Sequence, residues 1–266
     1  MENIKTLEQI KRPWVVAHRG YRGSYPENTL VAFEAAIGAN TDMIELDVSL
    51  TRDRIPVVIH DNTLDRTTNG SGPVSEHTLA ELKELDAGSW FSTKFSGEAI
   101  PTLEELLMSV KGRITVNIEI KPESFESPAI PDGIESQICE LVEKLEMGDS
   151  VLISSFEHFF FARIHRWYRN QGKSTLPKVA PLQEAPLSEE LALGLCSRQG
   201  AYSFHPDENF VTPSLIETLK ADGFRIFPYT INKEKRMEQL IQWGVTGIIS
   251  DEPELVWKVI RKLGVD

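Results

Sequence analysis

Short apolar runs rich in β-branched residues alternate along the chain with segments of helical periodicity. Eight of these runs are typical of strands, and most neighbouring runs are separated by a helical pattern, which predicts parallel pairing. The predicted strands are residues 14–17, 43–50, 115–120, 151–155, 178–182, 201–204, 225–230 and 247–250. Eight parallel strands with intervening helices predict an α/β fold, specifically a (β/α)8 TIM barrel.

One further apolar run, IPVVIH at 55–60, follows the second strand after only a few residues. A parallel neighbour would need a crossover of about a dozen residues or more, so this run is predicted to fold back as an antiparallel hairpin extension. With a turn centred near Arg52 and Asp53, His60 would lie roughly opposite Glu45. The hairpin would then carry a histidine to the barrel strand.

The segment at about 62–112 is too long for an ordinary barrel loop. It contains the polar run DNTLDRTTNGSGPVS, a helical TLAELKEL and the aromatic LDAGSWFSTKF, and it ends where PTLEELLMSV resumes a barrel helix. We predict a small insertion at the barrel mouth. Because no internal repeat or low-complexity segment appears, residues 1–266 are predicted to form a single barrel domain that includes this insertion.

The first residues, MENIKTLEQIKRP, place Ile4, Leu7 and Ile10 at helical spacing, which predicts a short helix covering one end of the domain. They carry charges throughout, and no later segment has the apolar length of a membrane span. The two cysteines, Cys139 and Cys196, form no CxxC pair, which indicates a reducing compartment. We therefore expect a cytoplasmic protein with no stable membrane association.

The chain is acidic, with 28 Lys and Arg against 40 Asp and Glu and a formal net charge of −12. Nucleic acids and anionic membranes are held largely by Lys and Arg, so the charge argues against both as partners. An anionic small molecule would need positive groups gathered at one place. The oligomeric state stays open at this point.

Charged side chains collect at the predicted carboxyl ends of the first strands, where barrel enzymes build their sites. The second and third strands each carry charged residues at alternate positions, which places them on one face. Charges in a barrel interior are costly unless they are paired or bind a metal. The candidate residues are His18, Arg19, Glu45, Asp47, His60, Glu119 and Lys121.

The three carboxylates of this set, Glu45, Asp47 and Glu119, indicate an oxygen-rich site for one hard divalent cation, Mg²⁺ or Ca²⁺. Zinc bound by the two histidines is a less favoured alternative. A second alternative is a layer of salt bridges with Arg19 and Lys121 that only fills the barrel. The position of the charges at the carboxyl ends of the strands favours a functional site.

The two histidines suit general acid–base catalysis near neutral pH. Arg19 and Lys121 would then hold the non-bridging oxygens of a phosphate, with arginine as the bidentate partner. Asp61, next to His60, either orients an imidazole or caps the following turn.

Several polar residues outside this set have simpler interpretations. Asp251 in ISDEP is interpreted as a helix cap, and Asn28 in PENT as the N-cap of the next helix. Phe156 and Tyr229 line the barrel mouth or serve only packing. His205 is a further candidate for the lining of the mouth.

Taken in order, these motifs resemble the glycerophosphodiester phosphodiesterase family. The shared segments cover nearly everything from residue 14 to 257, and they are AHRG, PENT, ELDV, PVVIHD, LDRTTNGSG, LDAGSWF, IPTLEE, NIEIK, ISSF and GVTGIISDEP. The resemblance implies a barrel with a small insertion, a divalent cation and two catalytic histidines. Carried over by position, it assigns catalysis to His18 and His60, the metal to Glu45, Asp47 and Glu119, and the phosphate to Arg19 and Lys121.

The resemblance also implies the substrate, a glycerophosphodiester such as glycerophosphocholine, cut to sn-glycerol 3-phosphate and an alcohol. We hypothesise His18 as the base and His60 as the acid. A related barrel phosphodiesterase acting on lysophospholipids is one alternative, which an exposed apolar rim around Trp90, Phe91 and Phe95 would favour. A non-catalytic phosphodiester-binding protein on the same fold is the other.

Two positions depart from the family's usual pattern. Arg54 stands where members often carry glycine, and arginine lacks glycine's freedom at positive φ, so another turn type is expected. Tyr229 stands where members often carry tryptophan, which bears on the preferred headgroup.

Overall fold

The computed structural model describes residues 10–126, 133–173 and 175–266 of the chain. Most of the expected N-terminal helix, including Ile4 and Leu7, lies outside the described residues. Within the described parts, one sheet runs in the order β8-β7-β6-β5-β4-β2-β1-β9, and β3 pairs with β2 beside this path. Its parallel strands are β1 (Trp14–Ala17), β2 (Met43–Leu50), β4 (Thr115–Ile120), β5 (Val151–Ser155), β6 (Lys178–Gln183), β7 (Ser203–Pro206), β8 (Arg225–Ile226) and β9 (Gly247–Ser250).

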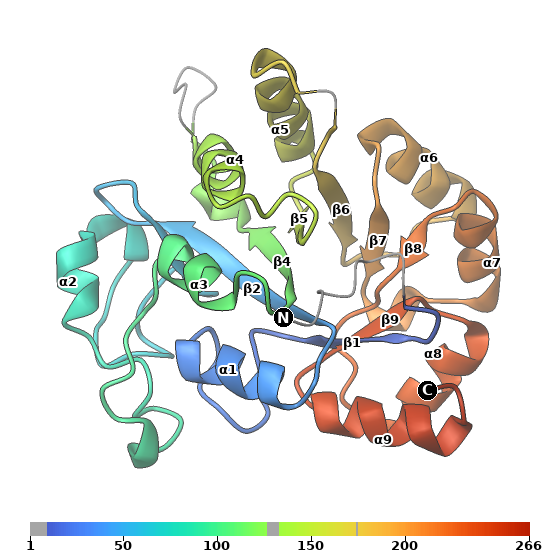
Figure 1. The fold of residues 1–266 in the computed structure, drawn as a ribbon, viewed down its shortest axis with the longest axis horizontal. Helices are drawn as coiled ribbons and strands as arrows, with labels where there is room; N and C mark the ends of the chain where they lie inside the picture. The colour runs from blue at the N-terminus through green and yellow to red at the C-terminus, as the bar shows by residue number, and fades with distance from the viewer. Residues whose placement is uncertain (1–9, 127–132, 174) are drawn as a thin grey trace.

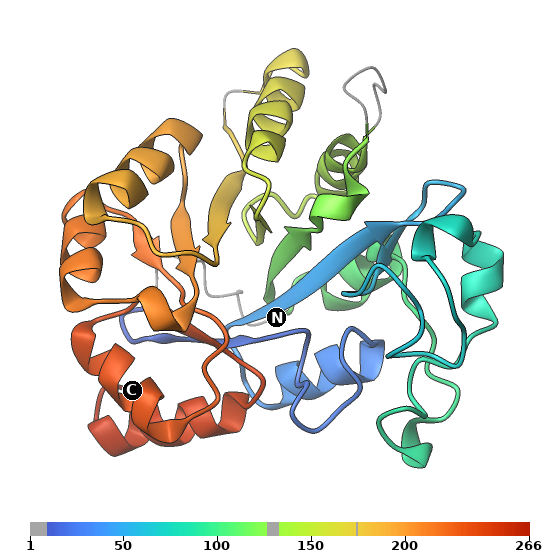
Figure 2. The same ribbon diagram turned by 180° about the vertical axis from the view of Figure 1, so that it is seen from behind.

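The strands form a nearly closed barrel with the helices outside it, which confirms the predicted (β/α)8 fold (Figures 1 and 2). Backbone hydrogen bonds across the last gap bring β9 to the segment of β8, since Thr246 N donates to Ile226 O at 3.0 Å and Ile249 N to Pro228 O at 3.1 Å. The helices are α1 (Leu30–Gly38), α2 (Leu79–Lys83), α3 (Leu103–Val110), α4 (Ile134–Lys144), α5 (Phe159–Asn170), α6 (Glu189–Gln199), α7 (Pro213–Ala221), α8 (Glu234–Trp243) and α9 (Pro253–Leu263).

Three strands differ from their predicted bounds, and the one expected at 178–182 is only one residue longer, since it ends at Gln183. The strand expected at 201–204 begins two residues later, at Ser203. The strand expected at 225–230 is regular only over Arg225–Ile226. Pro228 follows, and because proline has no N–H it cannot donate to a ladder.

Apolar side chains fill the barrel interior near the amino ends of the strands. Charged side chains lie on the same inward face of the strands, further toward the carboxyl ends. Met43 belongs to the interior cluster, and Glu45 and Asp47 follow it at alternate positions of β2. The interior cluster consists of Trp14, Val16, Met43, Leu152, Ala180, Phe227 and Ile249. This division places the polar groups at the carboxyl ends of the strands.

Helix α3 shows how local sequence covers the outside of the barrel. Thr102 and Glu105 form a capping box at its start, and four apolar residues recur at helical spacing behind it. These buried residues are Leu103, Leu106, Leu107 and Val110. They join the large cluster between sheet and helices, so this part of the predicted 62–112 insertion packs as a barrel helix.

The run at 55–60 pairs antiparallel with β2 as β3 (Pro56–Val58), in the register Val48 with Val58, Ser49 with Val57 and Leu50 with Pro56. Continued by two residues, this register sets His60 opposite Leu46, one residue from the expected Glu45. Arg54 adopts a φ of 61°, so the expectation of a turn that avoids positive φ there is wrong. Its guanidinium contacts both carboxylate oxygens of Glu126, at 2.7 and 3.0 Å.

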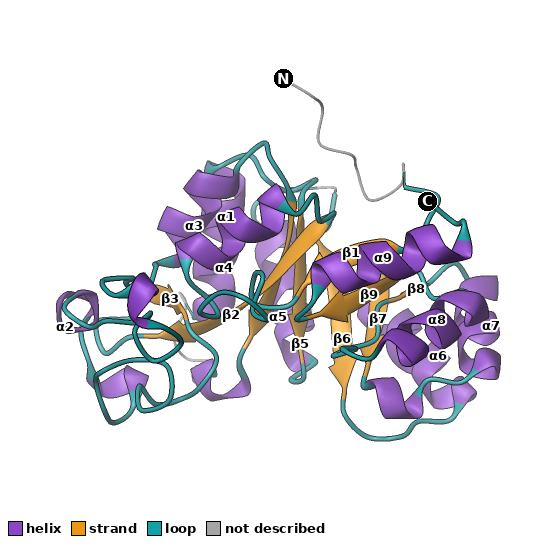
Figure 3. Ribbon diagram, turned by 90° about the horizontal axis from the view of Figure 1, so that it is seen from below, coloured by secondary structure: helices purple, strands orange, loops and turns teal. Residues whose placement is uncertain are grey.

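The remainder of the insertion lies to one side of the strands, around α2 (Figure 3). It has a small core of its own, to which Val57 of β3 also contributes. The core residues are Val57, Ile59, Leu64, Val74, Leu82, Ala87 and Ile100. The short 3₁₀ turns η1 (Val74–Glu76) and η2 (Thr93–Phe95) belong to this segment. The insertion therefore packs against the hairpin that carries His60. None of the described helices is long and apolar enough to cross a membrane.

Candidate active site

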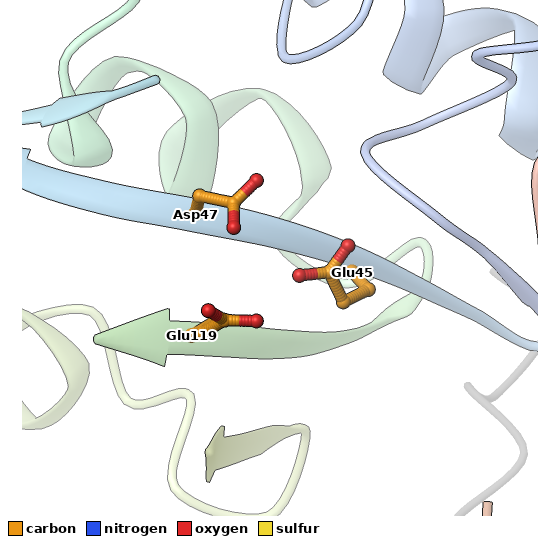
Figure 4. A group of neighbouring side chains, drawn as sticks. All are labelled: Glu45, Asp47 and Glu119. Carbon is orange, nitrogen blue, oxygen red and sulfur yellow. The ribbon is translucent and has the colours of Figure 1, made fainter. Parts of the chain in front are cut away.

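Three carboxylates converge where the carboxyl end of β4 lies beside the middle of β2 (Figure 4). Glu45 and Asp47 come from β2, Glu119 comes from β4, and Asp47 and Glu119 are partners in the parallel register. All three residues are buried, and each offers an oxygen within 4.8 Å of the others. The Oε1 atom of Glu45 is buried without a hydrogen-bond partner among the described residues. A buried set of oxygen donors with an unpartnered atom suits a hard divalent cation.

The electrostatics of the three carboxylates show the cost of this arrangement. Burial, together with the charges of Asp47 and Glu119, raises the pKa of Glu45 well above its usual value. Burial and the charge of Asp47 raise the pKa of Glu119 to about 7. Burial also acts to raise the pKa of Asp47, but Arg19 and Lys121 outweigh it and hold that pKa below its usual value. A bound cation would offset the mutual repulsion of the three groups.

Two side-chain cations face the carboxylates. Lys121 Nζ lies 2.9 Å from Glu119 Oε1 and 3.6 Å from Asp47 Oδ1. Arg19 Nε lies 3.2 Å from Asp47 Oδ2, and its backbone N–H donates to Glu45 Oε2 at 2.9 Å. The ion pairs expected from the salt-bridge alternative are thus present, and they hold both cations next to the carboxylates.

Each of the two histidines makes a short contact with an aspartate. His18 Nδ1 lies 2.6 Å from Asp251 Oδ1, and its Nε2 lies 4.0 Å from Glu45 Oε2. His60 Nδ1 lies 2.6 Å from Asp61 Oδ1. With Nδ1 engaged, Nε2 of each ring is left for chemistry. Burial lowers the pKa of both imidazoles, although the aspartates act in the opposite direction.

The contacts of Asp61 and Asp251 distinguish between an orienting role and a capping role for each side chain. Asp61 contacts an imidazole, which supports the orienting role over the turn cap. The interpretation of Asp251 as a helix cap is wrong, because Glu252 is the N-cap residue of α9. The carboxylate of Asp251 instead accepts from Arg22 Nη1 at 2.9 Å and from Asn232 Nδ2 at 2.7 Å, besides its contact with the His18 ring.

The interpretation of Asn28 as an N-cap is also wrong. Thr29 caps α1, and its side-chain oxygen accepts from Ala32 N. Asn28 is buried with a φ of 57°, a left-handed conformation that asparagine tolerates better than most residues. Its Nδ2 donates to Asp47 Oδ2 at 2.9 Å. Asn28 therefore helps to fix the central carboxylate, a role that its position in PENT did not indicate.

Glu27 is a buried site residue that the sequence analysis missed. It lies in the loop before α1, and its carboxylate accepts hydrogen bonds from Arg19, Arg22 and Arg66. Burial acts to raise the pKa of Glu27, but the three guanidinium groups hold it far below its usual value. Its place in the shared PENT motif is the signal that could have marked it, whereas its partners come from two different loops and could not be read from the sequence.

The later strands contribute little charge. His205 does not line the mouth, because it is fully buried, contacts Phe227 and has Nε2 2.9 Å from Ser203 Oγ. Burial lowers its pKa to about 3. Phe156 and Tyr229 pack edge to face at 6.0 Å between ring centroids, and the Tyr229 hydroxyl is buried without a partner among the described residues.

The aromatic residues of the insertion form a chain of ring contacts and only a small exposed surface. Trp90 is 37% exposed and donates its indole N–H to Ala87 O, whereas Phe95 is buried. Phe91 contacts both Trp90 and Phe95. The rim that would favour lysophospholipids is therefore confined mainly to Trp90.

The model of the glycerophosphoryl diester phosphodiesterase family matches residues 18–255. The glycerophosphodiester phosphodiesterase of Caldanaerobacter subterraneus subsp. tengcongensis is 41% identical over 251 residues, which cover 94% of this chain and 98% of that protein. The enzyme of the same name from Bacillus altitudinis is 36% identical over 94% of this chain and 98% of its own length.

Among solved structures, an Oleispira antarctica phosphodiesterase in complex with the product sn-glycerol-3-phosphate superposes with a TM-score of 0.82. It is 29% identical and covers 94% of this chain and 97% of its own. Fold, site and relatives together define a barrel phosphodiesterase, a phosphoric diester hydrolase. The chain belongs to the glycerophosphodiester phosphodiesterase family, and the resemblance predicted from its motifs is confirmed.

Proposed function

We propose that the protein hydrolyses glycerophosphodiesters to sn-glycerol 3-phosphate and an alcohol, with one divalent cation, Mg²⁺ or Ca²⁺, and with His18 and His60 as acid–base catalysts. The observation that carries the proposal is the convergence of three buried carboxylates, two cations and two aspartate-bound histidines at one end of the barrel. The product bound by the Oleispira antarctica relative supports the substrate class.

Glu45, Asp47 and Glu119 would hold the cation. When bound, the cation supplies positive charge to the phosphate oxygens in the transition state. Three buried carboxylates supply only oxygen donors, and this favours a hard cation over the zinc alternative, in which His18 and His60 would be ligands.

Arg19 and Lys121 would bind the non-bridging phosphate oxygens. Both lie beside the carboxylates, Arg19 at 3.2 Å from Asp47 and Lys121 at 2.9 Å from Glu119. A phosphate bound next to the cation would therefore meet a guanidinium and an ammonium at once, and a fixed positive environment stabilises the charge that develops there.

His18 would act as the base that takes a proton from the nucleophile, and His60 as the acid that gives one to the leaving oxygen. The side chain of His18 is 13% exposed and that of His60 is 30% exposed. The more open ring suits the side on which the alcohol departs to solvent. A neutral His18, favoured by burial, suits a base near neutral pH.

The two buried and unlinked thiols, Cys139 and Cys196, support a reducing, cytoplasmic location. A single domain is supported by the shared core of β3 and the insertion. The cytoplasmic location and the single-domain organisation are therefore proposed together with the activity.

The test is release of glycerol 3-phosphate from a panel of glycerophosphodiesters, with and without chelator, by the wild type and by Glu119→Ala. We expect release in Mg²⁺ or Ca²⁺, and its loss both in chelator and in the variant. Arg113→Ala is the matched control, because Arg113 pairs with Glu34 on an exposed surface outside this site. The absence of release from every diester, with cleavage of lysophosphatidylcholine instead, would replace this substrate class by lysophospholipids.

A further inference from the structure

The carboxylate of Glu27 accepts four hydrogen bonds from three arginines. Oε1 accepts from Arg19 Nη1 and from Arg66 Nη2, each at 2.8 Å. Oε2 accepts from Arg22 Nε at 2.8 Å and from Arg66 Nη1 at 2.9 Å. A carboxylate has about four lone-pair sites, so the acceptor capacity of Glu27 is filled. Its side chain is 2% exposed, and it is thus a buried anion whose hydrogen-bond donors, among the described residues, are all guanidinium groups.

Two of these arginines continue to the histidine–aspartate pairs. Arg22 Nη1 donates to Asp251 Oδ2 at 2.9 Å, and the other oxygen of Asp251 contacts His18 Nδ1. On the opposite side, Arg66 Nε donates to Asp61 Oδ2 at 2.6 Å, and the other oxygen of Asp61 contacts His60 Nδ1. Each histidine is therefore followed by an aspartate and an arginine, and both series end on Glu27.

We propose that Glu27 is a positioning residue that couples the two histidines, through Arg22 and Asp251 to His18 and through Arg66 and Asp61 to His60. The proposal rests on the proposed function, in which these two rings move the protons. By holding both arginines, Glu27 fixes the aspartates that set the orientation and tautomer of each ring. The third arginine, Arg19, links the same carboxylate to the phosphate site.

Glutamate is the residue type that this position requires. Glutamine has the same length, but it offers one acceptor oxygen, and its amide N–H groups would point at guanidinium donors. Three guanidinium groups would then converge without an anion between them. Aspartate keeps the charge but is one methylene shorter, so it can restore part of the coupling.

The coupling is measured by a double-mutant cycle in the full-length protein. Arg22 and Arg66 have side chains 33% and 40% exposed, so their alanine variants leave the buried core intact. We expect Arg22→Ala and Arg66→Ala each to lower kcat by about 10-fold to 100-fold, a range seen for residues that orient ligands and bases. In the double variant Arg22→Ala/Arg66→Ala, the loss of kcat should be far smaller than the product of the two single losses, because each single change already disturbs the Glu27 carboxylate that both sides share.

Glu27→Gln should lower kcat at least as much as either arginine variant, and Glu27→Asp should recover part of the loss. Arg113→Ala removes a paired arginine outside the network and should leave kcat unchanged. KM for the diester should change less than kcat in Arg22→Ala and Arg66→Ala, because neither residue is assigned to the phosphate. Strictly multiplicative losses in the double variant would overturn the coupling.

A spectroscopic measurement separates this inference from the proposed function. In protein labelled with ¹⁵N-histidine and held at one pH, ring signals of His18 and His60 are identified by His18→Gln and His60→Gln. Arg66→Ala should shift the ring nitrogens of both histidines, although Arg66 contacts the aspartate beside His60 and not the one beside His18. A shift of His60 alone would contradict the coupling. Failure of the wild type to release glycerol 3-phosphate would remove the proposed function, while the ring signals would still decide whether the two sides are coupled.

Discussion

The two histidine–aspartate pairs have the same contact distance but are built in different ways. Both pairs join Nδ1 to a carboxylate oxygen at 2.6 Å. His18 and Asp251 are 233 residues apart, whereas His60 and Asp61 are adjacent. The side chains of the first pair are 13% and 14% exposed, and those of the second are 30% and 27% exposed.

The difference shows that barrel closure and the insertion each hold one aspartate beside one histidine. His18 follows β1 and Asp251 follows β9, and these strands are neighbours only because the barrel brings the ends of the chain together. Asp61 is placed by its sequence position next to His60 and held by Arg66 of the insertion. The first pair thus depends on the whole fold, and the second depends on a local segment and one arginine.

The largest expected effect is the loss of either ring. His18→Ala and His60→Ala should each lower kcat by about 10²-fold to 10⁴-fold, the usual contribution of acid–base catalysis. Steady-state release of glycerol 3-phosphate measures this. A variant of either histidine that keeps wild-type kcat would show that only one pair takes part in the reaction.

Removing the charge of each aspartate should have a smaller effect. Asp251→Asn and Asp61→Asn should each lower kcat by about 10-fold to 100-fold, because the ring loses the partner that fixes its tautomer. The same assay compares the two. Equal KM in both variants is expected, since neither carboxylate is assigned to the phosphate, and a rise in KM without a change in kcat would contradict the orienting role.

The stability of the fold should separate the two pairs. Asp251→Ala leaves Arg22, Asn232 and the buried His18 without their carboxylate, and should lower the free energy of unfolding by about 2–3 kcal/mol. Asp61→Ala should cost less than about 1 kcal/mol, because its pair is more exposed. Urea denaturation at pH 7 measures both. A larger cost for Asp61→Ala would reverse the comparison.

The smallest expected effect is the loss, in acid, of the part of the free energy of unfolding that the ionised Asp251 carboxylate contributes. Burial acts to raise the pKa of Asp251, but the contacts with His18 and Arg22 lower it to about 2, below the value of 3.8 for the free side chain. The ionised form is thus favoured by folding, and this contribution, roughly 2 kcal/mol, is complete above about pH 4 and is lost as the pH falls through 2. The difference in urea stability between the wild type and Asp251→Asn should shrink over this range. A difference that stays constant down to pH 2 would contradict the assignment of the low pKa.

The site was predictable where its residues share a short segment. Glu45 and Asp47 share a face because strand side chains alternate, and His60 and Asp61 are adjacent. Arg54 shows the limit of local rules, since it keeps the positive φ that its side chain disfavours while pairing with Glu126. The caps assigned to Asn28 and Asp251 failed for the same reason, because tertiary partners competed with the local backbone for their side chains.

The sequence by itself determined the strand periodicity, the barrel, the family and which seven residues are candidates for the site. These features follow from local patterns, because alternation and the length of each run do not depend on distant residues. The tertiary structure decided which aspartate meets His18, where Asn28 points and how three arginines meet on Glu27. Those contacts join segments far apart in the chain, and only the closure of the barrel and the packing of the insertion fix their distances.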